Sequence, residues 1–292
     1  MQNREKQKKI ERFEIIELIR VSIDEDLGGY GDLTSGYLIE RQSHSGAYII
    51  CKQKDGAVLS GIDIAGYVFN EISGDINFEK LKEDGQFINN KDIICKIGGP
   101  TCSILAAERT VLNFIQHMSG IATYTRKFSK IAAKYNVKIT DTRKTKPGLR
   151  KIEKYAVVCG GGFNHRFGLF DGILIKDNHI AAAGGIKKAF ERIKGCIPHN
   201  LKVEVEVKSF SQLDEALACS ADIIMLDNMD PGQISRAVKI IRQKAPSSCL
   251  VEVSGGVELE NVEDICAAGA DIISAGCITH SAPSVDFSLE FE

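Results

Sequence analysis

The sequence predicts an α/β protein in which an N-terminal α+β domain precedes a domain built from parallel strands. Two observations lead to this fold class. Up to about residue 100, short strands follow one another closely and are joined by turn signals such as Lys54-Asp55-Gly56, which is typical of a hairpin. Beyond residue 120, short apolar strands alternate with helical segments, which indicates a parallel sheet or barrel. We therefore expect domains over residues 1–117 and 118–279, with a C-terminal tail over 280–292 that packs back on the first domain.

The first domain is expected to begin with an amphipathic helix. Ile10, Phe13 and Ile16 fall at helical spacing within residues 8–22. The acidic segment from Asp24 to Thr34 contains glycines but lacks the spacing of a calcium loop, so we interpret it as a helix stop and an irregular turn. The elements expected after it are strands over 47–51 and 57–59, a helix over 62–72, short strands between 75 and 98, and helices over 102–117 and about 120–135.

The helix over 102–117 carries charged residues on its apolar stripe. Glu108 and Arg109 lie three or four residues from apolar neighbours on both sides, so each of them needs a partner or a functional site. They could form a structural ion pair at an interface, or Arg109 could bind an anionic substrate. The residues alone leave both interpretations open.

The strands of the second domain end in residues that can carry chemistry. Six strands are expected, over 137–140, 172–175, 201–207, 222–226, 250–253 and 271–274. Barrel enzymes gather their catalytic groups at the C-terminal ends of such strands. The candidates at these ends are Arg143, Lys144, Lys176, Glu206, Lys208, Asp227, Asn228 and two loops of small residues, Ser254-Gly255-Gly256 and Ser274-Ala275-Gly276. Because small residues let backbone N–H groups approach an anion, the two loops predict a phosphate-binding site.

The strand over 201–207 alternates valine with glutamate. Glu204 and Glu206 therefore share one face of the strand. Both faces of a parallel sheet are covered, so these acids should point to a polar interior or to the mouth of the barrel. There they need a cation, either Lys176 or a magnesium ion.

Residues 141–180 form a basic island. They include eight Lys and Arg but only four Asp and Glu, in a chain of formal net charge −2. Turns at Lys146-Pro147-Gly148 and Gly160-Gly161-Gly162 interrupt the island and place its cations on loops. We interpret the glycine run as a connection that brings Asn164-His165-Arg166 to the pocket. The island suggests a small anionic ligand, since a nucleic acid would require a broad basic face.

This island resembles the core of the quinolinate phosphoribosyltransferase family, also called carboxylating nicotinate-nucleotide pyrophosphorylases. The family motifs are present in order at 141–145 (DTRKT), 147–148 (PG), 153–157 (EKYAV), 160–162 (GGG), 164–166 (NHR) and 175–179 (IKDNH). Weaker matches extend from Glu25 to Pro283, so the resemblance covers nearly the whole chain. Two departures are Lys146, where threonine is common, and Phe163, where the family often has histidine. Neither removes a cation, so we expect them to tune activity.

The resemblance implies a sandwich-like α+β domain followed by an open parallel α/β barrel with about seven strands. It implies that quinolinate and 5-phosphoribosyl 1-diphosphate are converted to nicotinate mononucleotide, diphosphate and carbon dioxide in NAD biosynthesis. Mg²⁺ is expected with the diphosphate substrate, near Glu206 and Asp227, and no organic cofactor is expected. A homodimer or a hexamer of dimers is implied, in which Arg109 enters the neighbouring subunit's active site.

Two anionic ligands suit the candidate residues. The dianion quinolinate is expected to contact Arg109, Arg143, His165, Arg166 and Lys176. The sugar phosphate is expected to contact Lys144, Thr145, Glu206, Asp227, Ser254, Gly255, Gly256, Ser274, Ala275 and Gly276. The residues expected to act in catalysis are Lys144, Lys176, Glu206 and Asp227.

Composition narrows the class of protein further. No apolar run approaches the ~20 residues of a membrane helix, and the N-terminus has no signal-peptide core. Nine cysteines without a Cys-x-x-Cys pair favour reduced thiols in the cytoplasm. A sequence pI near 6.3 disfavours nucleic-acid binding. The alternatives are a same-fold paralogue, either associated with molybdate transport or transferring phosphoribosyl without decarboxylation, and a non-catalytic regulator that binds a phosphorylated metabolite.

Overall fold

A computed structural model describes residues 9–292, and the chain divides into two compact units. The first unit comprises residues up to 126, together with 146–161 and 281–292. The second comprises residues 127–145 and 162–280. The chain therefore leaves the second unit after Thr145, forms one helix of the first unit, and returns at Gly162.

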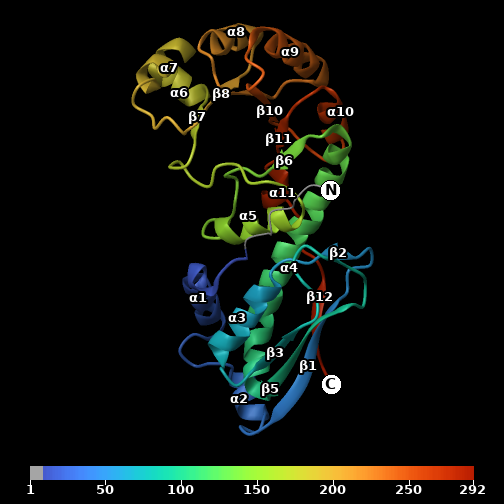
Figure 1. Cartoon of the computed structure of the whole chain (residues 1–292). Coiled ribbons are helices and arrows are strands. Elements are labelled where there is room, and N and C mark those ends of the chain that lie inside the picture. Colours follow the sequence, from blue (N-terminus) through green and yellow to red (C-terminus); the bar gives the residue numbers. More distant parts are fainter. Residues whose placement is uncertain (1–8) are drawn as a thin grey trace. The chain divides into compact units, whose positions relative to one another are not determined.

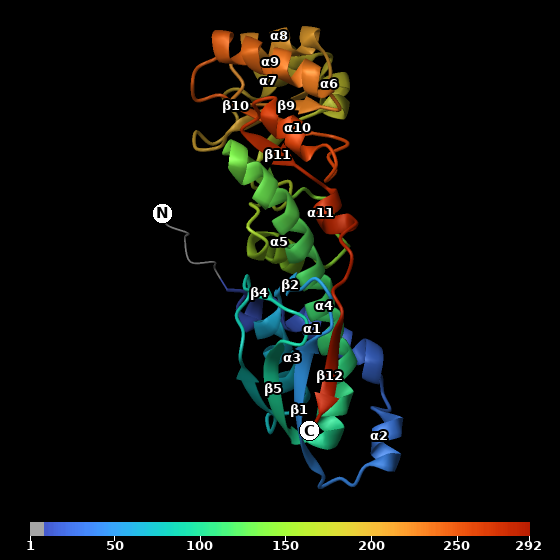
Figure 2. The ribbon, with the colours of Figure 1, turned by 90° about the vertical axis from the view of Figure 1, so that its right-hand side faces the viewer.

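The first unit is built on a four-stranded antiparallel sheet of order β12-β1-β5-β3. Its strands are β1 (His44–Cys51), β3 (Asn77–Lys80), β5 (Ile93–Pro100) and β12 (Phe287–Phe291), and a separate pair is formed by β2 (Ala57–Val58) and β4 (Phe87–Ile88). Alternate residues of β1, namely Ala47, Ile49 and Cys51, are buried, as expected for a sheet with one covered face. The C-terminal strand β12 runs beside β1, with Leu289 opposite Ile49 (Figure 2).

The helices of the first unit include three that the sequence predicted, α1 (Ile16–Leu27), α3 (Ile62–Ile72) and α4 (Thr101–Ala132), and two that it did not, α2 (Leu33–Leu38) and α5 (Arg150–Cys159). A 3₁₀ turn η1 (Arg12–Glu14) precedes α1. The sequence predicted two helices, over 102–117 and about 120–135, where the structure has the single helix α4. Ser119 and Gly120 do not break it, because a lone glycine in a helix costs only about 1 kcal/mol and the flanking residues are apolar and buried. The last turns of α4, from Lys127, belong to the second unit.

The second unit is built on a six-stranded parallel sheet of order β6-β11-β10-β9-β8-β7. The strands are β6 (Lys138–Thr140), β7 (Ile173–Ile175), β8 (Val203–Val207), β9 (Ile223–Asp227), β10 (Leu250–Ser254) and β11 (Ile272–Ser274). This confirms the predicted fold class and all six predicted strands. In place of a full seventh strand, Phe163 makes a single parallel bridge to Thr140 beside β6.

Helices connect successive strands from β7 to β11 and lie along the outer side of the sheet, and a further helix follows β11 (Figure 1). The connecting helices are α6 (Asp177–Ala183), α7 (Ile186–Ile193), α8 (Phe210–Ala218), α9 (Pro231–Lys244) and α10 (Val262–Ala267), and the helix after β11 is α11 (Cys277–His280). A 3₁₀ turn η2 (Ala133–Tyr135) follows α4. The start of α9 shows how the sequence determines where a helix begins. The Asp230 carboxylate accepts a hydrogen bond from the N–H of Gln233, and Pro231 occupies the first turn. Over residues 9–292, every helix is too short or too polar to cross a membrane.

Candidate active site

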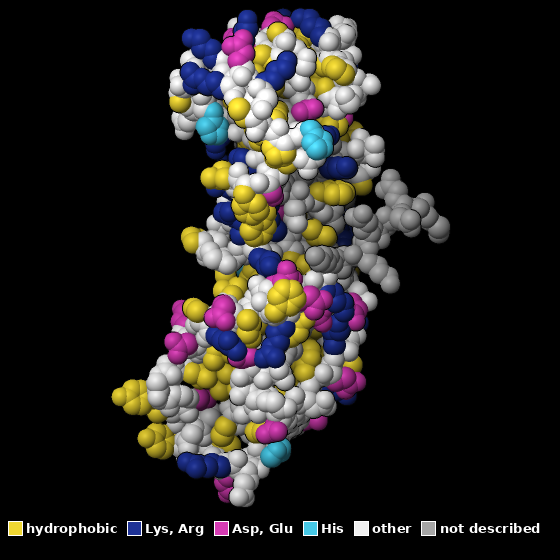
Figure 3. Space-filling model, turned by 60° about the vertical axis from the view of Figure 1, so that its left-hand side comes forward, with side chains coloured by type: hydrophobic (Ala, Val, Ile, Leu, Met, Phe, Trp, Pro, Cys, Tyr) yellow, Lys and Arg dark blue, Asp and Glu magenta, His cyan; other side chains and the backbone are white. Residues whose placement is uncertain are grey.

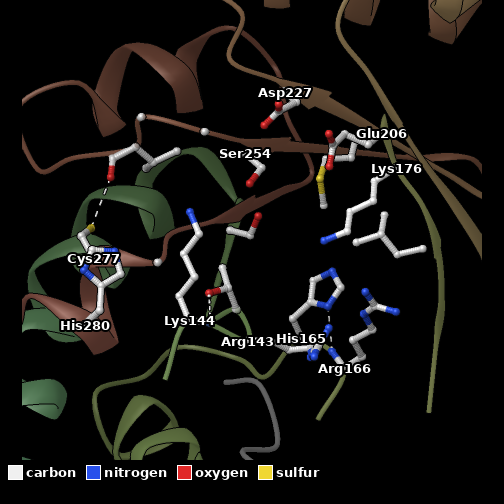
Figure 4. Close-up of a pocket in the computed structure, with 18 of the residues that line it drawn as sticks. Arg143, Lys144, His165, Arg166, Lys176, Glu206, Asp227, Ser254, Cys277 and His280 are labelled. Carbon is white, nitrogen blue, oxygen red and sulfur yellow. Dashed lines mark hydrogen bonds between the residues drawn. The ribbon is translucent and has the colours of Figure 1, made fainter. Parts of the chain in front are cut away.

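A cavity of about 480 Å³ lies at the carboxyl ends of the parallel strands in the second unit. Figure 4 shows Lys144 and Lys176 pointing into this space, with Glu206 and Asp227 along one side. The lining residues that the sequence predicted are Arg143, Lys144, His165, Arg166, Lys176, Glu206, Asp227, Ser254, Gly255, Gly256, Ser274 and Gly276. They come from separate segments of the chain, and the common direction of the strands brings them together.

Six predicted candidates do not line the cavity, namely Arg109, Thr145, Asn164, Lys208, Asn228 and Ala275. Thr145 is half-buried beside it, and Ala275 is buried with its N–H bonded to the carbonyl of Thr140. Arg109 belongs to α4 in the first unit. The two departures from the family pattern, Lys146 and Phe163, do not line the cavity either.

Arginine and lysine side chains form the cationic part of the cavity. Arg166 lies in an irregular segment between β6 and β7, where its Nη1 donates to the carbonyl of Gly172 at 3.1 Å. Burial and the nearby charge of Arg143 lower the pKa of Arg166, which means that the two guanidinium groups are close and incompletely solvated. Together with Lys176 they can bind a small anion with more than one carboxylate.

Glu206 and Asp227 form a carboxylate pair on the neighbouring strands β8 and β9. Each side chain is 13% exposed. Burial raises the pKa of Glu206, and the adjacent charge of Asp227 raises it further. Lys208 Nζ lies 3.7 Å from Glu206 Oε1 and 3.6 Å from Asp227 Oδ2. Two partly exposed carboxylates on neighbouring strands offer the oxygen ligands that a magnesium ion prefers.

The loops after β10 and β11 require small residues. Gly255 has a φ of +86°, and a Cβ there would overlap the side chain of Asn228. A Cβ on Gly276 would come within 2.9 Å of Lys144 Cδ and 3.2 Å of His280 Nε2. The absence of a side chain on Gly276 therefore lets Lys144 lie against the backbone, which suits the binding of a phosphate group at this end of the cavity.

His165 joins the cavity to a buried pair of acids beneath it. Its Nε2 lies 3.2 Å from Glu204 Oε2 and 3.4 Å from Glu252 Oε1. Burial lowers the pKa of His165, but the two neighbouring carboxylates raise it by more, and burial raises the pKa of Glu204 to about 7. The three groups therefore bind protons as one coupled set.

Several lining residues were missed by the sequence reasoning. They are Thr142, Leu174, Met225, Val257, Glu258, Cys277 and His280. Thr142 stands inside the 141–145 motif and could have been included on that ground. Leu174 and Met225 are apolar strand residues that look like ordinary core positions in the sequence. Glu252 shows the same alternation with valine as Glu204, and that pattern could have identified it.

A parallel α/β sheet with a cavity lined by charged residues at its strand ends is the arrangement of α/β barrel enzymes. Residues 32–119 match the N-terminal domain of quinolinate phosphoribosyl transferase, and residues 121–290 match its C-terminal domain. The chain belongs to the quinolinate phosphoribosyl transferase family.

Individual relatives are similar over most of the chain. A Bacillus subtilis protein named "Probable nicotinate-nucleotide pyrophosphorylase [carboxylating]" is 41% identical over 266 residues, which are 91% of this chain and 89% of that protein. A protein of the same name from Methanocaldococcus jannaschii is 40% identical over 280 residues, which are 94% of this chain and 96% of that protein. The solved nicotinate-nucleotide pyrophosphorylase of Francisella tularensis is 42% identical, with a TM-score of 0.90 over 99% of this chain and 100% of that structure.

Proposed function

We propose that the protein transfers phosphoribosyl from 5-phosphoribosyl 1-diphosphate to quinolinate with loss of carbon dioxide, giving nicotinate mononucleotide and diphosphate for NAD biosynthesis. The observation that carries this proposal is the division of one cavity into two parts. Arg143, Arg166 and Lys176 suit a dicarboxylate, while Lys144, the carboxylate pair and the glycine loops suit a sugar phosphate. The names of relatives about 40% identical over most of their length support the same reaction.

The first step joins the two substrates. The pyridine nitrogen of quinolinate attacks the anomeric carbon of the ribose, and the bond from that carbon to the diphosphate oxygen breaks. The transition state has oxocarbenium character, so the carboxylates of Glu206 and Asp227 stabilise the positive charge on the sugar. Lys144 stabilises the negative charge on the departing diphosphate. Holding both substrates in one cavity supplies much of the rate enhancement.

The second step removes a carboxylate. The pyridine nitrogen is now cationic and stabilises the electron pair left on the adjacent ring carbon when carbon dioxide departs. A proton then adds to that carbon. Lys176 is the candidate either to hold the carboxylate or to supply the proton, and a Lys176→Ala variant with unchanged turnover would remove it from both roles.

Magnesium fits the carboxylate pair. Glu206 and Asp227 would hold the ion through their oxygens, and when bound with the diphosphate it would supply positive charge to the leaving group. The ammonium group of Lys208 lies 3.7 Å from Glu206 and 3.6 Å from Asp227, so these two carboxylates already have a positive charge beside them.

We also propose that the protein forms a homodimer, or a hexamer of dimers, in which Arg109 completes the neighbouring subunit's quinolinate site. Large apolar side chains at the surface support association: Tyr30, Tyr37 and Leu38 of the first unit are 90%, 89% and 75% exposed. Hydrophobic side chains of this kind are visible at the surface in Figure 3. A cytoplasmic location is proposed as well, supported by the nine cysteines, which all lie within the described residues and form no disulfide there.

The test is an assay of the purified protein with 5-phosphoribosyl 1-diphosphate, Mg²⁺ and either quinolinate or nicotinate. We expect nicotinate mononucleotide and carbon dioxide with quinolinate only. Turnover with nicotinate would instead identify a phosphoribosyltransferase without decarboxylation. Binding of 5-phosphoribosyl 1-diphosphate without turnover of either acid would favour a non-catalytic paralogue or regulator.

A further inference from the structure

Arg166 stands on a segment without regular structure. Residues 164–172, between the bridge at Phe163 and strand β7, contain no helix or strand. An arginine that binds a planar carboxylate through two N–H groups must be held in a fixed orientation, which a flexible loop does not provide. The contacts of its neighbour His165 show how this segment is fixed.

His165 is bonded at its backbone and at both ring nitrogens. Its N–H donates to Oδ1 of the buried Asp141 at 2.9 Å. Its Nδ1 accepts the backbone N–H of Arg166 at 2.8 Å. Since Nδ1 is an acceptor, the ring proton is on Nε2, which faces Glu204 and Glu252 at 3.2 and 3.4 Å.

The two acids are fixed by the sheet. Glu204 is the second residue of β8 and Glu252 the middle residue of β10, and the two side chains are 5% and 1% exposed. Each strand is bonded to β9, which lies between them. The Nε2 contact therefore links the irregular segment to the hydrogen-bonded sheet, and the ring links the sheet to Arg166 through Nδ1.

A divalent metal ion is the other occupant that a His-Glu-Glu group could accept, since its three ligand atoms lie within 4.8 Å of one another. Binding a metal at Nε2 would require the ring proton to move to Nδ1. That proton would face the N–H of Arg166, and the 2.8 Å hydrogen bond would be lost. The geometry therefore favours a proton at Nε2 over a metal ion.

We propose that Glu204 and Glu252 are positioning residues that act through His165 to hold Arg166 in the anion-binding cavity. The part played by Arg166 in binding quinolinate rests on the proposed function, whereas the hydrogen-bonded arrangement itself does not. Glutamine at either acid retains an oxygen that accepts from Nε2, and its amide can donate to the remaining carboxylate. Leucine has a similar size but retains neither group.

The first experiment compares Glu252→Gln with Glu252→Leu, and Glu204→Gln with Glu204→Leu. We expect each leucine variant to raise KM for quinolinate at least ten-fold and to change KM for 5-phosphoribosyl 1-diphosphate less than two-fold. Each glutamine variant should stay within about three-fold of the wild type for both. Equal increases in both KM values, or equal losses for glutamine and leucine, would overturn the proposal.

Asp271→Leu is the matched control. Asp271 anchors the same sheet through Arg242 and the N–H of Val251, at the ends of the strands opposite the cavity. This variant should lower the thermal unfolding midpoint while leaving both KM values unchanged. A selective rise in KM for quinolinate in Asp271→Leu would show that general loosening of the sheet, and not the His165 contact, causes the effect.

The second experiment does not depend on activity. The ring nitrogens of His165 can be assigned by ¹⁵N NMR among the six histidines, using His165→Gln to identify its signals. We expect Nε2 to be protonated and Nδ1 not, and the addition of Zn²⁺ to leave these signals in place. Protonation of Nδ1, or displacement of the Nε2 proton by Zn²⁺, would overturn the proposal. If the wild type neither binds nor converts quinolinate, the proposed function fails, and the NMR result still decides the arrangement.

Discussion

Lys208 Nζ lies 3.6 Å from Asp227 Oδ2, so a protein cation stands beside the carboxylate pair at the mouth of the cavity. The same ammonium group lies 2.9 Å from Asp177, which gives it an alternative partner. A magnesium ion bound by Glu206 and Asp227 would repel Lys208, and the lysine could then remain with Asp177 alone. Lys208 and the metal ion are therefore expected to compete.

Replacing Lys208 with methionine should strengthen metal binding. An exposed ion pair contributes about 0.2–1 kcal/mol, so affinity for Mn²⁺ as a magnesium substitute should rise up to about five-fold. Electron paramagnetic resonance of free Mn²⁺ during a titration measures this. Lys239→Met, which changes an exposed lysine on α9, is the control and should match the wild type. Unchanged or weaker Mn²⁺ binding in Lys208→Met would contradict competition.

Asp227→Asn should reduce turnover much more than substrate binding. The change keeps the size of the side chain but removes a negative charge that is expected to act mainly in the transition state. Loss of one preorganised electrostatic group typically lowers kcat by about 10²–10³. Steady-state kinetics at saturating substrates would measure this, and Glu206→Gln should behave similarly. A normal kcat with a raised KM would instead assign Asp227 to ground-state binding.

Mixing two inactive variants tests whether subunits share active sites. Arg109→Ala and Arg143→Ala should each lose most activity, because each removes a cation from the expected quinolinate site. In mixed oligomers, one site would contain both arginines, so partial activity should return. The assay is turnover after co-refolding or co-expression with two tags. Absence of rescue in oligomers shown to contain both chains would count against sharing through Arg109.

Local patterns place most of the strand-end candidates at the cavity, although Lys208 and Asn228 do not line it. Alternation of strands and helices indicates parallel strands, and parallel strands bring their carboxyl ends to one edge. Lys176, Glu206 and Asp227 can be named in this way from the amino-acid sequence alone, and all three line the cavity. The glycine loops after β10 and β11 follow from the same argument.

Contacts between distant segments could not be predicted in this way. His165 meets Glu204 and Glu252 only because the sheet brings β8 and β10 to the irregular segment, and no local pattern encodes that meeting. Alternation placed Glu204 and Glu206 on one face, but their surroundings differ, since Glu204 is buried beside a histidine and Glu206 lies beside Lys208. The two helices predicted over 102–117 and about 120–135 form the single helix α4, whose continuity depends on packing that the sequence alone does not show.

Stability of the first unit should depend on the ionisation of Asp84. This carboxyl accepts from the N–H of Ile62 and the hydroxyl of Tyr155, and burial is the main cause that raises its pKa. A folded-state pKa above the ordinary value of about 3.9 means that stability is fully present below that value and is lost as pH rises through the folded pKa. Asp84→Asn, which stays neutral, should escape this loss.

Denaturant unfolding of the wild type and Asp84→Asn from pH 4 to pH 7 would test this prediction. The free energy of unfolding of the variant should rise relative to that of the wild type as pH increases. Asp75→Asn, at an exposed position in the same unit, should follow the wild type. A constant difference between Asp84→Asn and the wild type across this range would show that Asp84 titrates as it does in the unfolded chain.

Gly120 should be intolerant of a side chain. It lies in α4 where the C-terminal segment crosses the helix, and a Cβ on it would overlap the carbonyl oxygen of Pro283 and approach Ser284 Cα at 3.1 Å. Alanine normally stabilises a helix by about 1 kcal/mol relative to glycine. Here the obstacle is backbone, which cannot rotate away as a side chain could, so overpacking of about 1–3 kcal/mol should exceed that gain.

Gly120→Ala is therefore expected to lower the thermal midpoint, whereas Gly74→Ala, at an exposed position with open space around it, should change it little. Thermal unfolding monitored by circular dichroism would compare the two variants, and equal midpoints would show that the chain over 283–284 moves aside at no measurable cost.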